Sequence, residues 1–245
     1  EIEFDHVSFA YPEAGENVLT DISFKAKKGQ TIAVIGSTGS GKSTLINLIP
    51  RYYDVTKGSV KVDGVDVRDM TQKELRDKLG YVPQKGVLFS GTIDSNIRYG
   101  KPEITDSQVK EAAEVAQATE FIDTKPEKYE SPVSQGGTNV SGGQKQRLSI
   151  ARAIAKDPEI FIFDDSFSAL DFKTDSQLRK ALKEYTKDAT TVIVAQRIST
   201  ILGADQIIVL DDGHMAGIGT HKELMANCEV YQQIARSQLS EEELA

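Results

Sequence analysis

The sequence is poor in cysteine, histidine and tryptophan, and the shortages of cysteine and histidine argue against an internal disulfide and a zinc site. Of its 245 residues one is cysteine, three are histidine and none is tryptophan. The single thiol, Cys228, forms no internal disulfide, which indicates a reducing compartment, and it is expected to be a small packing residue rather than a nucleophile. The histidines lie far apart at positions 6, 214 and 221. Because this is not the spacing of zinc ligands, no zinc site is predicted.

Long hydrophobic runs and an excess of basic residues are also missing. No apolar run approaches the ~18 residues that a membrane-spanning helix needs. Lys and Arg number 29 against 37 Asp and Glu, and the resulting net charge of -8 disfavours nonspecific binding to nucleic acid or to an anionic membrane. The first residues contain neither Met nor a signal-peptide pattern, so we expect a domain excised from a longer chain.

What the sequence does contain is an alternation of strand and helix patterns. Residues 2–11 and 18–27 alternate apolar and polar side chains, which predicts an antiparallel β layer, and Asp63-Gly64 predicts the turn of another hairpin. Residues 92–118 have a helical pattern, with Thr105 or Asp106 as the N-cap. Further strands are predicted at 31–36, 159–165, 190–196 and 205–212, and further helices at 141–157 and 173–185. Strands alternating with helices predict an α/β fold with a mostly parallel sheet.

Residues 36–44, GSTGSGKST, carry the strongest chemical signal. They fit the pattern G-x-x-x-x-G-K-[ST] at Gly36, Gly41, Lys42 and Ser43, between an apolar strand and a helical segment. Glycines let such a loop fold around an anion, with backbone N–H groups pointing inward. The motif predicts a phosphate-binding loop in which Lys42 contacts the β- and γ-phosphates and the Ser43 hydroxyl binds Mg²⁺.

Two adjacent carboxylates, Asp164 and Asp165, end the apolar run that begins at Ile160. Because unpaired carboxylates are rarely tolerated in apolar surroundings, the pair indicates a site, although Asp165 could merely cap the next segment. At the carboxyl end of a parallel strand, Asp164 is expected to help hold Mg²⁺. With the phosphate-binding loop, the pair predicts an NTPase, which fits a kinase, GTPase, helicase or transporter motor.

Residues 140–147, VSGGQKQR, narrow this choice. A serine followed by two glycines at a helix start exposes a hydroxyl and free N–H groups, which makes a second candidate anion site, although it could also be a flexible helix entry. Together with the phosphate-binding loop and the Asp-Asp strand, this stretch resembles the signature motif of the ATP-binding cassette (ABC) family. The resemblance covers nearly the whole chain.

The resemblance implies a fold and a domain organisation. The fold would be a P-loop NTPase of the α/β class, with a mostly parallel central sheet, an N-terminal antiparallel β layer and an α-helical subdomain. Residues 1–245 would form one nucleotide-binding domain. Within it, 1–83 and 150–245 would be the RecA-like core with the β layer, and 84–149 the helical subdomain that carries the signature. A transmembrane domain is expected upstream, in a longer chain.

The resemblance also implies cofactors and site residues. Tyr11 resembles the aromatic that stacks on adenine, Gln84 resembles the Q-loop glutamine near Mg²⁺, and Asp171 in SALD resembles a D-loop residue at a dimer interface. In the family's head-to-tail dimer, each ATP lies between one subunit's P-loop and the other's signature. The expected contacts to the chain's own ATP are Tyr11, Ser37, Thr38, Gly39, Ser40, Gly41, Lys42, Ser43, Thr44 and Gln84; those to the partner's ATP are Ser141, Gly142, Gly143, Gln144 and Asp171; and the metal ligands are Ser43, Gln84 and Asp164.

Two catalytic positions depart from the family's pattern. The second acid is usually Glu, the general base, but here it is Asp165, which loses roughly 1.5 Å of reach. Small misplacements of this kind can cost on the order of 100-fold in rate. The family's switch histidine falls on Gln196, which forms hydrogen bonds but carries no charge and shuttles no proton. Beside Lys42, the expected catalytic set therefore contains two degenerate positions.

These departures, combined with a sound signature, resemble the degenerate-site half of a heterodimeric bacterial multidrug exporter. The domain would hold MgATP in its own site, hydrolyse it poorly, and complete the active site of a non-identical partner subunit. Transmembrane domains would contact the regions of Gln84 and Gln135, where exporters usually carry an acid at the second position. The expected location is the cytoplasmic face of the cell membrane, with the isolated domain soluble and no nucleic-acid partner.

Two alternatives remain open. The chain could be an ordinary ATPase, active as a homodimer, in which Asp165 is an adequate base. It could also be a soluble ABC protein that acts on DNA or ribosomes. Against the second, DNA-repair members carry a long coiled coil between P-loop and signature, whereas about 100 residues separate Gly41 from Ser141 here. Translation-type members usually hold two cassettes, whereas this chain has one set of motifs.

Overall fold

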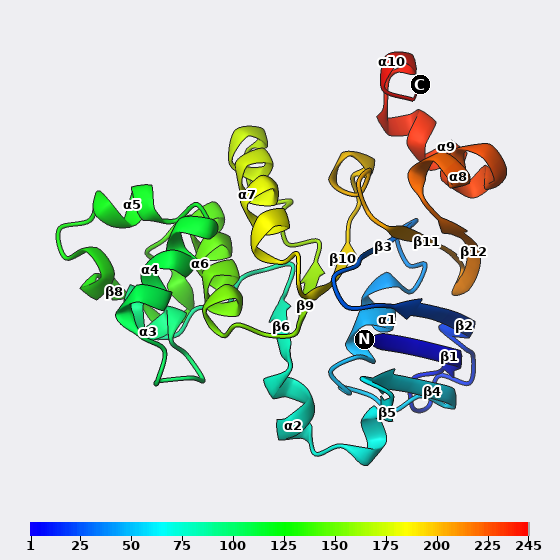
Figure 1. Cartoon of the computed structure of the whole chain (residues 1–245), viewed down its shortest axis with the longest axis horizontal. Coiled ribbons are helices and arrows are strands. Elements are labelled where there is room, and N and C mark those ends of the chain that lie inside the picture. The colour runs from blue at the N-terminus through cyan, green and yellow to red at the C-terminus, as the bar shows by residue number, and fades with distance from the viewer. Residues whose placement is uncertain (245) are drawn as a thin grey trace. The chain divides into compact units, whose positions relative to one another are not determined.

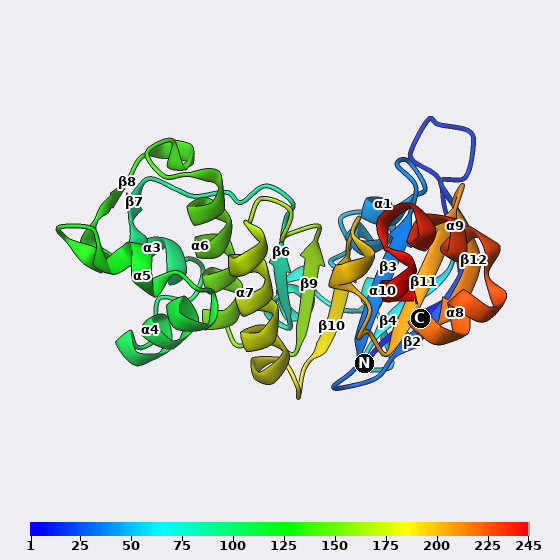
Figure 2. The same ribbon diagram turned by 90° about the horizontal axis from the view of Figure 1, so that it is seen from above.

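The computed structural model describes residues 1–244, and contacts within the chain divide it into two compact units (Figures 1 and 2). The first unit is Glu1–Leu79 together with the chain from Ala189 onward, and the second is Gly80–Asp188. The predicted helical subdomain, 84–149, lies inside the second unit. Ala245, which ends the predicted range 150–245, lies outside the described residues.

The first unit contains the predicted antiparallel layer (Figure 1). Its strands follow the order β2-β1-β4-β5, and all neighbouring pairs are antiparallel. Asp63 and Gly64 connect β4 to β5 with φ of 51° and 80°, the left-handed conformation that an Asp-Gly hairpin turn adopts. The predicted hairpin with Asp63-Gly64 as its turn is therefore confirmed. The strands are β1 (Ile2–Phe9), β2 (Leu19–Ala26), β4 (Lys57–Val62) and β5 (Val65–Asp66).

A parallel group of strands forms the second layer of the first unit. Strand β3 (Thr31–Gly36) lies between β10 (Thr190–Val194) and β11 (Gln206–Asp211), parallel to both. The inner residues of β3 are buried, as expected of a continuous apolar run inside a parallel sheet. Strand β12 (His214–Gly219), which the sequence did not predict, pairs antiparallel with β11. The helices of this unit are α1 (Lys42–Asn47), η1 (Val67–Asp69), α2 (Gln72–Asp77), η4 (Ile198–Thr200), α8 (His221–Asn227), α9 (Glu229–Gln238) and α10 (Glu241–Leu244).

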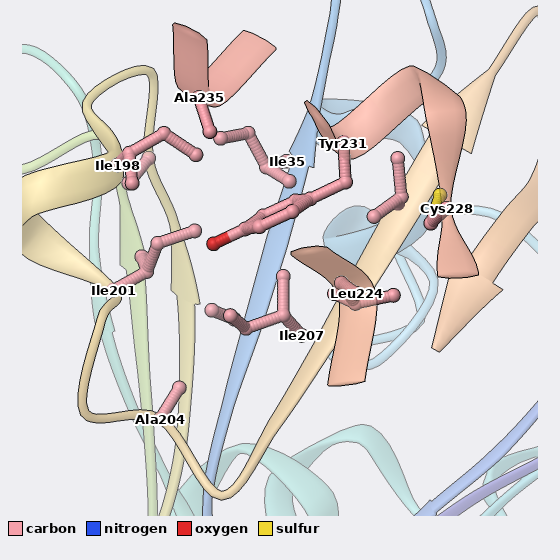
Figure 3. Packing of buried hydrophobic residues seen from close by; sticks show 12 residues of the cluster. Ile35, Ile198, Ile201, Ala204, Ile207, Leu224, Cys228, Tyr231 and Ala235 are labelled. Carbon is pink, nitrogen blue, oxygen red and sulfur yellow. The ribbon is translucent and has the colours of Figure 1, made fainter. Parts of the chain in front are cut away.

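The ring of Tyr231 lies in the middle of a hydrophobic cluster between α8, α9 and the parallel strands (Figure 3). Ile35 from β3, Ile207 from β11 and Leu224 from α8 are all buried in this cluster. Cys228 is also buried there, so its predicted role as a packing residue is confirmed. The cluster anchors the C-terminal helices to the sheet of the first unit.

The second unit contains helices and two short strand pairs. Strand β9 (Ile160–Asp164) lies beside β6 (Leu79–Val82), which the sequence did not predict, and β7 pairs with β8. The predicted helical pattern at 92–118 is divided into α3 and α4, and Thr105 is the N-cap of α4. The remaining elements are β7 (Gly91–Thr92), α3 (Ile93–Ile97), α4 (Asp106–Val115), α5 (Thr119–Asp123), η2 (Lys128–Glu130), β8 (Pro132–Val133), η3 (Gln135–Gly137), α6 (Gly142–Ala155) and α7 (Phe172–Tyr185).

Five helices in the two units begin with the same local pattern of hydrogen bonds. The side-chain oxygen of the N-cap residue accepts a hydrogen bond from the backbone N–H three residues later, and that later side chain bonds back to the N-cap N–H. Such reciprocal boxes begin α2, α3, α4, α6 and α8, with Thr71, Thr92, Thr105, Ser141 and Thr220 as N-caps. Within residues 1–244 no helix combines the length and apolarity needed to cross a bilayer.

The contact between α8 and α9 joins a histidine to a tyrosine. Nδ1 of His221 lies 2.6 Å from the Tyr231 hydroxyl. Burial lowers the pKa of His221 from its usual 6.5 and raises the pKa of Tyr231 to about 12, so the hydrogen bond joins a neutral imidazole and a neutral phenol, and the tautomer of the ring decides which of them donates.

We expect this pair to lower the free energy of unfolding as the pH falls below 6.5, the ordinary pKa of His221. The unfolded chain then binds a proton at His221 that the folded chain resists binding. Urea denaturation at a series of pH values should show a flatter pH dependence for His221→Gln than for the unchanged protein. His214→Gln, a change at an exposed ring, is the control and should follow the unchanged protein. Equal slopes for the unchanged protein and His221→Gln would contradict this account.

Candidate nucleotide-binding site

A hollow of about 340 Å³ lies where β3 passes through a loop into α1. This volume is within the range of small-molecule pockets, roughly 300 to 1,000 Å³. Gln196 lies on its wall although it is about 150 positions away in the sequence. The hollow thus brings together most of the predicted phosphate-binding loop and the predicted switch position. Its lining is Val18, Thr38, Gly39, Ser40, Gly41, Lys42, Ser43, Thr44 and Gln196.

Lys42 folds back onto the loop that precedes it. Its Nζ atom donates hydrogen bonds to the backbone carbonyls of Gly36, at 2.6 Å, and Ser37, at 3.0 Å. Ser37 does not line the hollow, but it takes part through this bond. The contacts hold the ammonium group within the loop, where it provides the positive charge that an anionic ligand requires.

The two end glycines of the motif are required by close packing. A Cβ atom on Gly36 would lie 2.4 Å from the carbonyl oxygen of Leu210, so no side chain fits there. Gly41 has a φ of 103°, and a Cβ atom on it would approach a methyl carbon of Leu19 to 2.8 Å. The pattern in the sequence therefore has a steric cause in the structure.

Tyr11 lies beside the first turn of α1. Its hydroxyl is 2.8 Å from Oγ1 of Thr44, and its ring makes edge contacts with Phe9 and Tyr53 at centroid distances of 4.9 and 5.1 Å. These contacts hold the ring next to the loop. Stacking of Tyr11 on adenine stays a prediction.

The residues around the hollow fit a nucleoside triphosphate with Mg²⁺. The Ser40 hydroxyl is buried and, within residues 1–244, has no hydrogen-bond partner, as expected of a group that faces a polar ligand. Lys42 offers positive charge, and Ser43 lines the hollow with a hydroxyl suited to Mg²⁺. No group of three or more His, Cys, Asp or Glu suited to a metal occurs among the described residues.

In the second unit, Asp165 and Gln84 lie together. Nε2 of Gln84 donates to Oδ2 of Asp165 at 3.2 Å, and Asp165 has a left-handed φ of 47° directly after β9. Asp164 is the last residue of β9 and is half-buried. Asp165 is not the cap of the next helix, because α7 begins with Asp171 as its N-cap. Capping of the turn at 166–169, which follows Asp165 directly, stays a prediction.

The signature residues begin α6, the longest helix in this part of the chain together with α7. Oγ of Ser141 accepts a hydrogen bond from the backbone N–H of Gln144 at 3.1 Å, and Oε1 of Gln144 accepts from the Ser141 N–H at 3.3 Å. Ser141 and Gly142 are exposed. The contacts of Ser141, Gly142, Gly143 and Gln144 with a partner's nucleotide stay a prediction.

Asp171, the predicted D-loop residue, has a local role that its sequence motif did not indicate. As the N-cap of α7, it accepts hydrogen bonds from the backbone N–H of Thr174 at 2.9 Å and from the Thr174 hydroxyl at 2.7 Å. These bonds lower the pKa of Asp171 below its usual value, so this side chain is ionised at neutral pH.

Sequence analysis missed Gln146, which connects the signature helix to the segment that carries Gln84. The side chain is buried on α6; its Oε1 accepts from the Gly86 N–H at 2.8 Å, and its Nε2 donates to the Pro83 carbonyl at 3.0 Å. Gly86 permits this approach, since a Cβ atom there would lie 2.6 Å from the Ser149 hydroxyl. The available signal was a glutamine among the largely apolar and small residues of a predicted helix.

Comparison with known proteins adds three findings. The family described as ABC transporter matches residues 19–168. A Staphylococcus aureus (strain NCTC 8325 / PS 47) protein, whose name describes a multidrug export ATP-binding/permease protein, is 47% identical over 233 residues, which cover 95% of this chain and 40% of the relative. An ABC transporter ATP-binding protein of Mycobacterium bovis is 50% identical over 234 residues, 94% of this chain and 40% of that protein.

The solved structures include a bacterial Atm1-family ABC exporter with ATP bound. The two structures superpose with a TM-score of 0.94 and 38% sequence identity. The match covers 98% of this chain and 42% of the exporter chain. The predicted P-loop α/β fold, with its antiparallel layer and helical part, is confirmed. The chain spans about 40% of the length of the curated relatives it matches.

Replacing Gln146 by Leu should destabilise the protein. The change leaves the Gly86 N–H and the Pro83 carbonyl, which belong to half-buried residues, without their partner, and an unsatisfied buried group costs up to about 1–3 kcal/mol. We expect the free energy of unfolding, measured by urea denaturation, to fall by about 2 kcal/mol or more. Gln177→Leu, on the exposed face of α7, is the matched control and should change it by less than about 0.5 kcal/mol. A Gln146→Leu protein as stable as the control would refute the assigned role.

Proposed function

The chain belongs to the ABC transporter family, and we propose on that premise that it is the ATP-binding motor domain that drives a membrane exporter. It is an ABC-type ATPase domain of the exporter kind. The relatives carry this domain within chains about two and a half times as long. Export, the membrane-embedded partner and a location at the cytoplasmic face of the membrane are therefore parts of the proposal.

The observation that carries the proposal is the hollow at the start of α1, which gathers Lys42, Ser43 and Gln196. In this assignment MgATP is the ligand, and Mg²⁺ would neutralise charge on the β- and γ-phosphate oxygens. Lys42 binds phosphate oxygens, the Ser43 hydroxyl orients the metal, and the Gln196 amide donates a hydrogen bond toward the γ-phosphate. Tyr11, held by Thr44, offers its ring to the base.

We assign this site the role of holding ATP and hydrolysing it poorly. A general base must reach the proton that it removes, and Asp165 is one methylene shorter than the usual Glu. Its Oδ2 atom also accepts a hydrogen bond from Gln84, which draws the carboxylate toward that amide. Gln196 remains neutral at every physiological pH and shuttles no proton. Both departures weaken the same chemical step.

The signature would serve a second, non-identical subunit. Ser141 caps a helix of 14 residues, and its exposed start presents backbone N–H groups to an anion. In a head-to-tail dimer, Ser141, Gly143 and Asp171 would complete the partner's ATP site. The partner would then need its own intact general base, because this chain does not supply one of the usual length.

The membrane-embedded domains would contact the second unit near Gln84. Val87, Phe89 and Tyr99 are exposed to 51, 40 and 56%, and the two rings stack at a centroid distance of 4.2 Å. The guanidinium of Arg152 packs against both rings, at 5.3 Å from the centroid of Phe89 and 5.6 Å from that of Tyr99. An exposed apolar group of this kind suits a protein partner, and we propose it, with the exposed Gln135, for contact with transmembrane domains.

Restoring both catalytic positions tests the assignment. Steady-state MgATP hydrolysis by the unchanged protein, at high protein concentration, is compared with that of the Asp165→Glu/Gln196→His variant. We expect the restored protein to be at least about tenfold faster, because the longer carboxylate and the imidazole recover the alignment of the attacking water. Adding Lys42→Ala to the restored protein should abolish the gain, which assigns the activity to this site.

ATP binding is measured in parallel to separate the alternatives. Equal and substantial rates in both proteins would overturn the degenerate-site assignment and identify an ordinary homodimeric ATPase with Asp165 as its base. Failure of the unchanged protein to bind MgATP would overturn the motor assignment itself.

A further inference from the structure

The segment after β10 leaves the sheet just before it reaches the hollow. The N–H of Ala195 donates to the carbonyl of Val34 at 3.3 Å, which extends the ladder between β10 and β3 by one bond. Gln196 then lines the hollow, and η4 begins at Ile198. The path of residues 196–198 therefore decides where the Gln196 amide lies.

A side chain from α9 satisfies the backbone of this segment. Nε2 of Gln238 donates to the carbonyl oxygen of Gln196 at 2.7 Å, and Oε1 of Gln238 accepts from the N–H of Ile198 at 2.8 Å. Both ends of one amide thus bind backbone groups on either side of Arg197. A residue of a neighbouring parallel strand would make the same pair of bonds. Gln238 replaces the sheet where the sheet ends.

The helix that carries Gln238 is itself fixed against the same segment. Tyr231 and Ala235 are fully buried, in one cluster with Ile198 and Ile201 (Figure 3). Positions 231, 235 and 238 follow the spacing of one helix face. The Tyr231 hydroxyl is bonded to His221 in turn. Gln238 therefore extends from a well-anchored surface, although its own side chain is exposed.

We propose that Gln238 is a positioning residue for the nucleotide site, which holds the backbone from which Gln196 reaches the γ-phosphate. The inference rests on the proposed function, because it takes MgATP as the ligand of the hollow. ADP lacks the γ-phosphate. Loss of the bonds from Gln238 therefore weakens the binding of ATP and leaves that of ADP, which depends on the phosphate-binding loop, unchanged.

The preference for MgATP over MgADP, measured by isothermal titration calorimetry, tests this role without requiring hydrolysis. Gln238→Ala should reduce the ratio of the two affinities by about fivefold to tenfold, which corresponds to the loss of one ordinary hydrogen bond. The affinity for MgADP should stay within about twofold, which is the effect of less than one such bond. Gln233→Ala is the matched control. It changes an exposed glutamine of the same helix whose amide, in the part of the chain that the structure describes, donates only to Glu229, at 3.4 Å, and the ratio should not change.

A double-mutant cycle separates positioning from general stability. Gln196→Ala removes the contact with the γ-phosphate, so adding Gln238→Ala to it should cause no further loss of preference. A merely structural role for Gln238 would weaken MgATP and MgADP alike in both backgrounds. Additive losses of preference would overturn the inference.

Gln238→Glu provides a second variant in case the alanine protein folds poorly. The carboxylate still accepts from the Ile198 N–H, but it cannot donate to the Gln196 carbonyl. We expect it to lose the preference for MgATP while binding MgADP normally. An unchanged preference in a folded variant would overturn the role of Gln238 alone. Absence of binding of either nucleotide to the unchanged protein would instead overturn the proposed function.

Discussion

The close approach of backbone to backbone around the phosphate-binding loop is the constraint on which the rest of this structure depends. Gly36 ends a strand that is buried between two parallel neighbours, and the carbonyl of Leu210 occupies the space of a side chain. The turn between β11 and β12 completes the enclosure, since the Gly213 N–H donates to the carbonyl of Ser40 at 3.0 Å. The loop is thus held by strands on both sides, which leaves Lys42 and Ser43 in defined positions at the edge of the sheet.

Primary amides perform a second structural task in both units. Gln146 binds the loop that carries Gln84, and Gln238 binds the segment that carries Gln196. Asn96 does the same for Phe89, with one bond to its N–H and one to its carbonyl, both near 2.9 Å. An amide provides a donor and an acceptor on one planar group. It therefore satisfies loop backbone where no strand lies alongside, and it connects that loop to a helix.

The two departures at the catalytic positions have different structural settings. Asp165 lies at a left-handed turn and interacts with Gln84 within the second unit, so its geometry depends on how α6 holds the loop of Gln84. Gln196 lies in the first unit, and its geometry depends on α9. If the chain stores ATP rather than consuming it, as we propose, α9 contributes to the stability of the bound state, because Gln238 on this helix binds the backbone of Gln196.

Sequence alone determined the features that depend on neighbouring residues. The strand, glycine loop and helix around Lys42, the turn at Asp63-Gly64 and the capping residue Thr105 follow from contacts between residues a few positions apart, and all were predicted. Strands β6 and β12 were not predicted. Strand β12 is held by pairing with β11 and has no strong apolar alternation of its own. The family resemblance had already indicated Gln196 as a site residue, whereas only the tertiary structure assigned Gln146 and Gln238 to their loops. These contacts join segments far apart in the chain, and a sequence pattern carries no record of which distant backbone groups lack a partner.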